Sequence, residues 1–273
     1  MLYLFKHELF SRWSAVLGWG IGLGAFGVMY TSIFPQVADE VSLLADLQIY
    51  AALGIDLTSF EAFIASTTIQ FVPILLGIYA IITSTATLAG EEDDGTLETL
   101  VAMPIARWQI VTAKAAAIAV ALALTLLLAG LINAPVLAAV SQTVEVDVAP
   151  GQLIAVVLSG WPIVLAFTMI GLFLSALLPT RRAASLTLAV LFIASYFAEN
   201  LSGMVSSLEA IKPFSLFTYF DSSADVFREG VRAGDAAVLL AVAVVFFGLA
   251  LWAFHRRDLT VGAWPWQRPQ PES

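Results

Sequence analysis

Residues 82–118 read ITSTATLAGEEDDGTLETLVAMPIARWQIVTAKAAAI, and four consecutive carboxylates, Glu91 to Asp94, interrupt an otherwise largely apolar stretch. Charges of this density do not lie in hydrocarbon, so the segment must face water or a protein partner. The flanking runs 60–89 and 110–140 can each cross a bilayer, because about 20 helical residues at about 1.5 Å each suffice. The stretch predicts two membrane-spanning helices joined by a short acidic element.

The composition agrees with an integral membrane protein. Of the 273 residues, 60% are hydrophobic and 12% are charged, and the mean hydropathy is +0.90. A soluble domain carries about 25% charged residues. The net charge of −9, without any run of Lys or Arg, speaks against a nucleic-acid partner. With no Cys and only His7 and His255, we expect no disulfide and no metal site.

Six apolar segments are long enough to span, so we predict an all-α integral membrane protein with one transmembrane domain over 1–273. The first segment is too long for the apolar part of a cleavable signal. We expect Pro73 and Pro162 to kink the second and fourth helices. The six predicted spans are 14–34, 60–89, 110–140, 153–178, 183–205 and 236–254.

Three further segments lie outside these spans. Residues 3–13 predict a short amphipathic helix on the membrane surface. The stretch 206–220 is apolar but broken by Pro213 and by charges, which favours an interfacial or re-entrant helical pair before the last span. Residues 264–273 contain three prolines and predict a loose tail.

The distribution of Lys and Arg predicts the orientation, because cytoplasmic ends of spans are enriched in these residues. One set of ends carries Lys6, Arg12, Arg107, Lys114, Arg181, Arg182, Arg256, Arg257 and Arg268. The opposite loops carry Asp39, Glu40, Asp46, Asp56, Glu61, Glu145 and Asp147, and only the last loop adds Lys212, Arg228 and Arg232. We therefore expect both termini and the acidic element in the cytoplasm.

Closely spaced glycines mark the first predicted span. Residues 22–27, GLGAFG, fit the spacing of a dinucleotide-binding loop, but that loop requires a preceding strand, which an apolar span does not provide. Gly18, Gly20, Gly22 and Gly24 instead form overlapping small-xxx-small pairs that let helix backbones approach closely. We expect them to pack against another helix, at a subunit interface.

The acidic element predicts a short helix. Gly95 can cap its start, and Glu98 stands three residues further on, as in a weak capping box. Leu97, Leu100 and Val101 then share one face, and Pro104 ends the helix. The alternative is a solvated loop that contains a helical pattern by chance.

The run from Glu92 to Arg107, EDDGTLETLVAMPIAR, followed by Lys114, resembles the cytoplasmic signature of the type-2 ATP-binding-cassette (ABC) permeases, E-x-x-x-G-T-L-E-x-L-L-x-x-P-[IV]-x-R. The six spans, the amphipathic start and Lys212-Pro213-Phe214 before the last span are similar to that family's layout. Asp93 and Asp94 are not required by the pattern.

The resemblance implies the transmembrane subunit of an exporter of the type V fold, in a prokaryotic plasma membrane. Two such subunits, identical or different, would form the pathway, and two separate ATPase subunits would bind ATP and Mg, so this chain would hold no cofactor. Residues 96–103 would be the coupling helix, and Arg107 would pair with an acid on the ATPase or on the amphipathic start. The implied coupling residues are Glu91, Glu92, Gly95, Thr96, Leu97, Glu98, Leu100, Pro104 and Arg107.

Two other classes remain as alternatives. A self-sufficient secondary transporter would need ionisable residues deep in several spans, and Glu199-Asn200 is the only polar pair well inside a predicted span. A membrane-embedded protease with paired glutamates, here Glu91-Glu92, would need an arginine at position 96, where threonine stands, and histidines in later spans. The apolar spans suit a lipophilic cargo and suit lipid-facing helices equally well.

Overall fold

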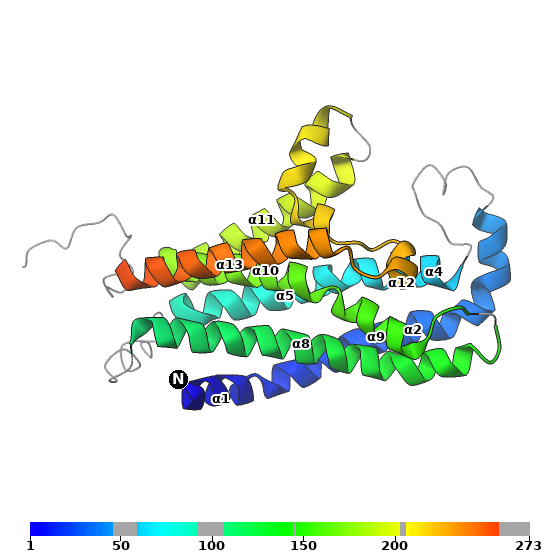
Figure 1. Ribbon diagram of the computed structural model, residues 1–273, viewed down its shortest axis with the longest axis horizontal. Coiled ribbons are helices and arrows are strands. Elements are labelled where there is room, and N and C mark those ends of the chain that lie inside the picture. Colours follow the sequence, from blue (N-terminus) through cyan, green and yellow to red (C-terminus); the bar gives the residue numbers. More distant parts are fainter. Residues whose placement is uncertain (46–58, 92–105, 145, 203–205, 257–273) are drawn as a thin grey trace, which may run out of the picture.

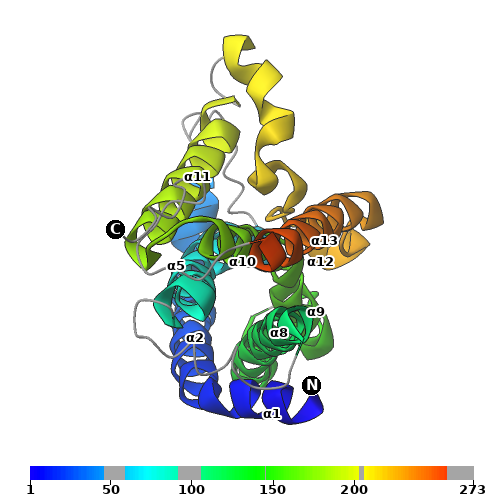
Figure 2. The same ribbon diagram turned by 90° about the vertical axis from the view of Figure 1, so that its left-hand side faces the viewer.

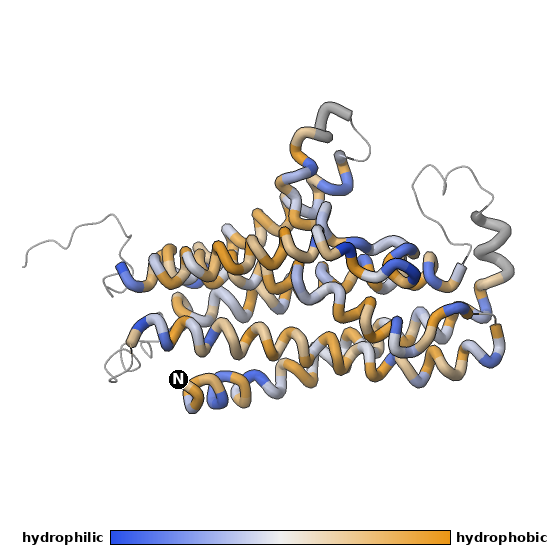
Figure 3. Tube along the Cα trace, in the orientation of Figure 1, coloured by the Kyte–Doolittle hydropathy of each residue, from blue (hydrophilic) through white to orange (hydrophobic). Residues whose placement is uncertain are grey.

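The computed structural model describes residues 1–45, 59–91, 106–144, 146–202 and 206–256, and these contain helices and no strand (Figure 1). Six of the helical stretches are long and apolar enough to cross a membrane. Hydrophobic residues fill the central length of these helices, and hydrophilic residues gather toward their ends (Figure 3). The predicted all-α architecture with six spans is confirmed.

Three of the spans are single helices of about the predicted extent, and a fourth begins earlier than predicted. The first is α2 (Trp13–Ala45), of which Trp13–Ala38 meets the criteria for a span. The fifth is α11 (Arg181–Ser202) and the sixth is α13 (Ala233–Arg256). The third is α8 (Arg107–Val140), which starts at Arg107 rather than at residue 110.

The second and fourth spans are each divided near a proline. The second consists of α4 (Phe60–Thr67), η1 (Ile69–Phe71), α5 (Val72–Thr85) and η2 (Ala86–Gly90), and Pro73 lies in the first turn of α5. The fourth consists of α9 (Pro150–Leu158) and α10 (Trp161–Leu177), and Pro162 lies in the first turn of α10. Proline lacks a backbone N–H, so it is best accommodated where a helix begins. The expected kinks are therefore breaks.

The packing of α2 corrects the prediction for its glycines. A Cβ added to Gly20 or Gly24 would come within 2.8 Å of Leu128 or 2.9 Å of Ile132, both on α8 of the same chain. Gly18 and Gly22 have no such neighbour within 4 Å. The four glycines alternate between two faces of α2, so only Gly18 and Gly22 remain open toward another subunit.

The other elements lie around the packed spans. Helix α1 (Leu2–Ser11) packs across α8, and α13 packs mainly along α10. Helix α11 and the elements η3 (Ser206–Phe214) and η4 (Leu216–Tyr219) project from one side of the bundle (Figure 2). The short helix α12 (Asp225–Glu229) leads into α13. We call the end of the bundle at α1 the α1 end, and the end at α4 and α12 the α4 end (Figure 1).

Polar contacts attach η3 and η4 to α11. The Ser215 hydroxyl donates to the Ser195 carbonyl at 2.7 Å, and the Leu216 N–H donates to the Ser195 hydroxyl at 2.9 Å. Glu199 accepts a hydrogen bond from Thr218 and forms a 3.6 Å ion pair with Lys212. The carboxylate that stood out in the fifth predicted span thus holds the segment that follows that span.

Candidate functional site

A buried lysine joins three elements at the α1 end of the bundle. Lys114 of α8 is fully buried, and its Nζ lies 2.6 Å from Glu8 Oε1 of α1 and 2.5 Å from Glu91 Oε1. Arg12, between α1 and α2, contacts the second oxygen of Glu8 at 3.2 Å. We call these four residues, Glu8, Arg12, Glu91 and Lys114, the ionic cluster.

The ionic cluster is balanced in charge, and this explains why it tolerates burial. An isolated ion costs several kcal/mol to transfer out of water, and only close opposite charges offset that cost. Two carboxylates here face two cations, and Lys114 reaches both carboxylates with short, charge-assisted hydrogen bonds. The helices that carry these side chains are therefore held together electrostatically as well as by apolar packing.

Glu91, at the end of the second span, has a shifted pKa. Burial raises the pKa of the Glu91 carboxyl above its ordinary value of 4.5, and the adjacent Lys114 opposes this shift without cancelling it. The desolvation of the carboxylate therefore outweighs its attraction to Lys114. The pairing of Glu91 with Lys114 therefore contributes less to the stability of the cluster than its short distance suggests.

A π-helical turn delivers Glu91 to the cluster. The turn η2 occupies Ala86–Gly90, directly before Glu91. Its wider winding is supported from α10, where the Ser175 hydroxyl accepts hydrogen bonds from the N–H groups of Leu88 and Ala89 and donates one to the Thr85 carbonyl. π-turns are rare and occur mostly at functional sites. This one fixes the last turn of the second span against α10.

The structure places two of the nine sequence-predicted coupling residues. Glu91 lies in the ionic cluster, where it contacts Lys114 of its own chain. Arg107 is the first residue of α8. The predicted coupling helix 96–103 and the predicted tail 264–273 lie outside the described residues. So do the coupling residues Glu92, Gly95, Thr96, Leu97, Glu98, Leu100 and Pro104, whose role stays a prediction.

Sequence reasoning placed Lys114 in the signature but assigned it no partner. It offered the acid of the amphipathic start, which is Glu8, as a partner for Arg107 and not for Lys114. The signal for Lys114 was available, since a lysine inside an apolar span requires a counter-charge. No local pattern in the sequence indicated that Lys114 pairs with Glu8, because Glu8 stands 106 residues earlier on a separate helix.

The fold and the cluster define a class of protein. Six apolar spans, a short helix packed across one end and a cluster of ion pairs at that end are the architecture of a multi-pass membrane protein. The family model described as ABC-2 family transporter protein matches residues 3–259, nearly the whole chain, so the chain belongs to the ABC-2 transporter family. It is a membrane permease subunit of an ABC transporter. Comparison with curated proteins gave no match.

Proposed function

We propose that this chain is the pathway-forming subunit of an ABC exporter and that residues 92–105 couple it to ATP hydrolysis in a separate nucleotide-binding subunit. The single observation that carries the proposal is the ionic cluster. Glu91 immediately precedes residues 92–105, Arg107 begins α8 immediately after them, and Lys114 lies two turns further along the same helix.

The ionic cluster gives a force on residues 92–105 a direct route into the bundle. Lys114 links the end of the second span to the third span, and through Glu8 to α1. A displacement of the segment would therefore shift three helices together. A segment that was only a solvated loop would not need both flanks anchored by buried charges, whose desolvation costs several kcal/mol.

The proposal assigns partners and orientation. Two ATPase subunits bind ATP and Mg and lie below the α1 end, which faces the cytoplasm of a prokaryotic cell, as the resemblance implies. A second permease subunit completes the pathway, and Gly18 and Gly22, which are open on α2, are suited to close contact with it. Glu92 and Glu98 meet basic side chains of the ATPase, whereas Glu91 acts within the chain by holding Lys114.

The test compares two variants, each with two neutralised carboxylates, in the complex that the permease would form with a P-loop ATPase subunit. Glu92→Gln with Glu98→Gln removes the proposed docking charges. A lost charge-assisted hydrogen bond is worth roughly 1.5–3 kcal/mol, so we expect the affinity for the ATPase to fall about tenfold or more. Asp93→Asn with Asp94→Asn is the matched control and should change little, as for solvated charges.

Two measurements separate the outcomes. The affinity of the ATPase for the reconstituted permease reports docking, and the ATPase rate of the complex reports coupling. Normal affinity together with a normal rate in the Glu92 and Glu98 double variant would show that residues 92–105 are a solvated loop, and would overturn the coupling assignment.

A further inference from the structure

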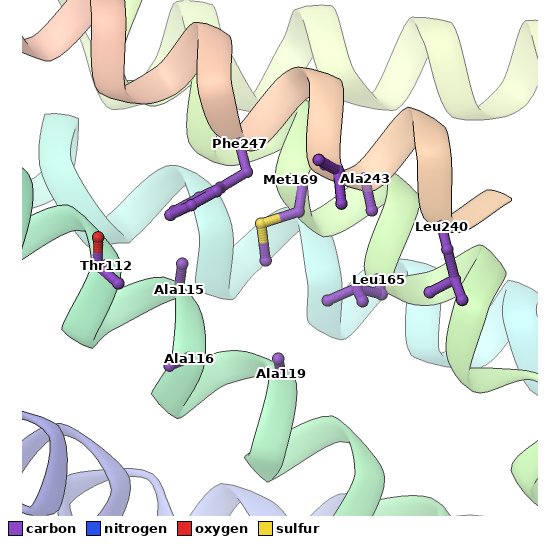
Figure 4. Close-up of a pocket in the computed structure, with 10 residues that line it drawn as sticks. Thr112, Ala115, Ala116, Ala119, Leu165, Met169, Leu240, Ala243 and Phe247 are labelled. Atoms are coloured by element: carbon purple, nitrogen blue, oxygen red, sulfur yellow. The ribbon is translucent and has the colours of Figure 1, made fainter. Parts of the chain in front are cut away.

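An apolar hollow lies between three spans, on a different face of α8 from Lys114. Its volume is about 270 Å³, and it is bounded by α8, α10 and α13. Figure 4 shows alanines of α8 on one wall, with Leu165 and Met169 of α10 and Phe247 of α13 facing them. Because α13 packs mainly on α10, the small alanine side chains leave the space beside α8 unfilled.

The side chains of the lining offer an occupant no free hydrogen-bond donor. Thr112 contributes the one side-chain hydroxyl, and that hydroxyl already donates to the Trp108 carbonyl at 2.7 Å. Every other lining side chain is hydrocarbon or the thioether of Met169. Cavities of this kind stay dry and take apolar guests, so a polar or charged ligand would lose its hydration without compensation.

The position of the hollow along α8 matches one leaflet of a bilayer. Thr112 and Ala119 stand 5 and 12 residues beyond Arg107, so at about 1.5 Å per residue the hollow extends from roughly 7 to 18 Å along the helix from the α1 end. One leaflet contributes about 15 Å, half of the hydrocarbon thickness. The hollow therefore lies in the half of the third span that faces the leaflet on the α1 side.

The two ends of the hollow differ in a way that suits a lipid. Toward the bilayer centre Trp161 of α10 lies against Ala119, because its indole N–H donates a hydrogen bond to the Ala119 carbonyl at 2.9 Å. Toward the α1 end Trp108 follows on the same face of α8, one turn from Thr112, and it is 55% exposed. Tryptophans in such positions lie at the headgroup level. On the open side Val244 is 68% exposed.

We propose that this hollow binds one acyl chain of a bilayer phospholipid, whose headgroup lies beside Trp108. The chain enters past Val244 from the surrounding leaflet and fills the space against the alanines of α8. The site is a lipid site on each permease subunit, and it does not require the lipid to be transported.

The test uses the full chain reconstituted in vesicles of phosphatidylethanolamine and phosphatidylglycerol with a trace of phospholipid that carries a photoreactive diazirine on one acyl chain. After illumination, peptide mass spectrometry locates the adducts. We expect adducts to be enriched on residues 112–119, 165–169 and 240–247, compared with the exposed face of α11 at Leu186, Val190 and Phe197.

Two variants reduce the space from opposite walls. Ala116→Phe fills the hollow from α8, and Val244→Phe covers its open side from α13, where an exposed residue tolerates a larger side chain. Both should reduce the adducts in the hollow to the level seen on α11. Ala138→Phe adds the same bulk to an exposed position at the far end of α8 and should leave them unchanged. Thermal unfolding in detergent verifies that each variant is folded.

Two results would overturn the proposal. The first is adducts spread evenly over all lipid-facing helices of the wild type. The second is unchanged labelling of the hollow in folded Ala116→Phe and Val244→Phe. Because adduct mapping needs neither ATP nor the ATPase, its failure is distinguishable from failure of the coupling proposal.

Discussion

Lys114 is the residue on which the α1 end depends most. It is the shared partner of Glu8 and Glu91, and it is fully buried. Removing it leaves the carboxylates of Glu8 and Glu91 without the cation that both of them contact. Removing Glu91 instead leaves Lys114 paired with Glu8, and burial already raises the pKa of Glu91, so the loss is smaller.

We expect Lys114→Met to destabilise the folded chain by about 3–5 kcal/mol, the cost of breaking a buried ion pair on one side. Glu91→Gln should cost clearly less. Lys6→Met is the matched control, since Lys6 of α1 is exposed and has no part in the cluster. Thermal unfolding of the three purified variants in detergent measures their order of stability. Equal stability of Lys114→Met and Lys6→Met would mean that the cluster does not hold the α1 end together.

At the scale of elements, close contact of α2 with α8 is permitted by glycines on one face of α2. Asn133 of α8 strengthens this contact by donating from Nδ2 to the Gly24 carbonyl at 3.1 Å. It also donates to the Ala129 carbonyl of its own helix at 2.9 Å. The two helices therefore share both a tight apolar seam and a hydrogen bond within the membrane.

Gly24→Ala should destabilise this contact, whereas Gly22→Ala should not. A Cβ at position 24 would lie 2.9 Å from Ile132 Cδ1 and 3.0 Å from Ile132 Cβ, and the second atom cannot rotate away. Such overpacking costs about 1–3 kcal/mol. At position 22 nothing lies within 4 Å, and alanine is the better helix former by about 1 kcal/mol.

The unfolding temperatures of the two alanine variants in detergent give the comparison directly. An equal decrease of the unfolding temperature in Gly24→Ala and Gly22→Ala would show that the two faces of α2 are equally packed, contrary to the arrangement described. If Gly22→Ala keeps its unfolding temperature but its subunits no longer associate, a second subunit contacts the face of α2 that carries Gly18 and Gly22.

At the scale of the whole molecule, the chain is a membrane permease subunit whose sequence has no nucleotide-binding P-loop. Its three lysines, Lys6, Lys114 and Lys212, lie outside any G-x-x-x-x-G-K-[ST] sequence, so it lacks the loop that cradles ATP phosphates in P-loop enzymes. We expect the purified chain to hydrolyse no ATP, and we expect hydrolysis only in a complex with the proposed P-loop ATPase subunit. Side-by-side rates with vanadate test this, and vanadate-sensitive hydrolysis by the chain alone would contradict it.

The sequence by itself determined the elements that local chemistry controls. Apolar runs of sufficient length specify six helices, because a backbone in hydrocarbon must satisfy its own hydrogen bonds. Pro73 and Pro162 mark the places where two spans are divided, because each removes a donor from the helical ladder. The acidic run at 91–94 excludes that segment from the membrane, and the signature at 92–107 indicates the family.

Only the tertiary structure decided which side chains meet. The pairing of Lys114 with Glu8 joins residues 106 positions apart, and no local pattern encodes it. The same holds for the division of the glycines of α2 into a packed and an open face, and for the hollow beside α8. Helix periodicity shows which residues share a face, but the packing of the six helices in three dimensions determines what each face contacts.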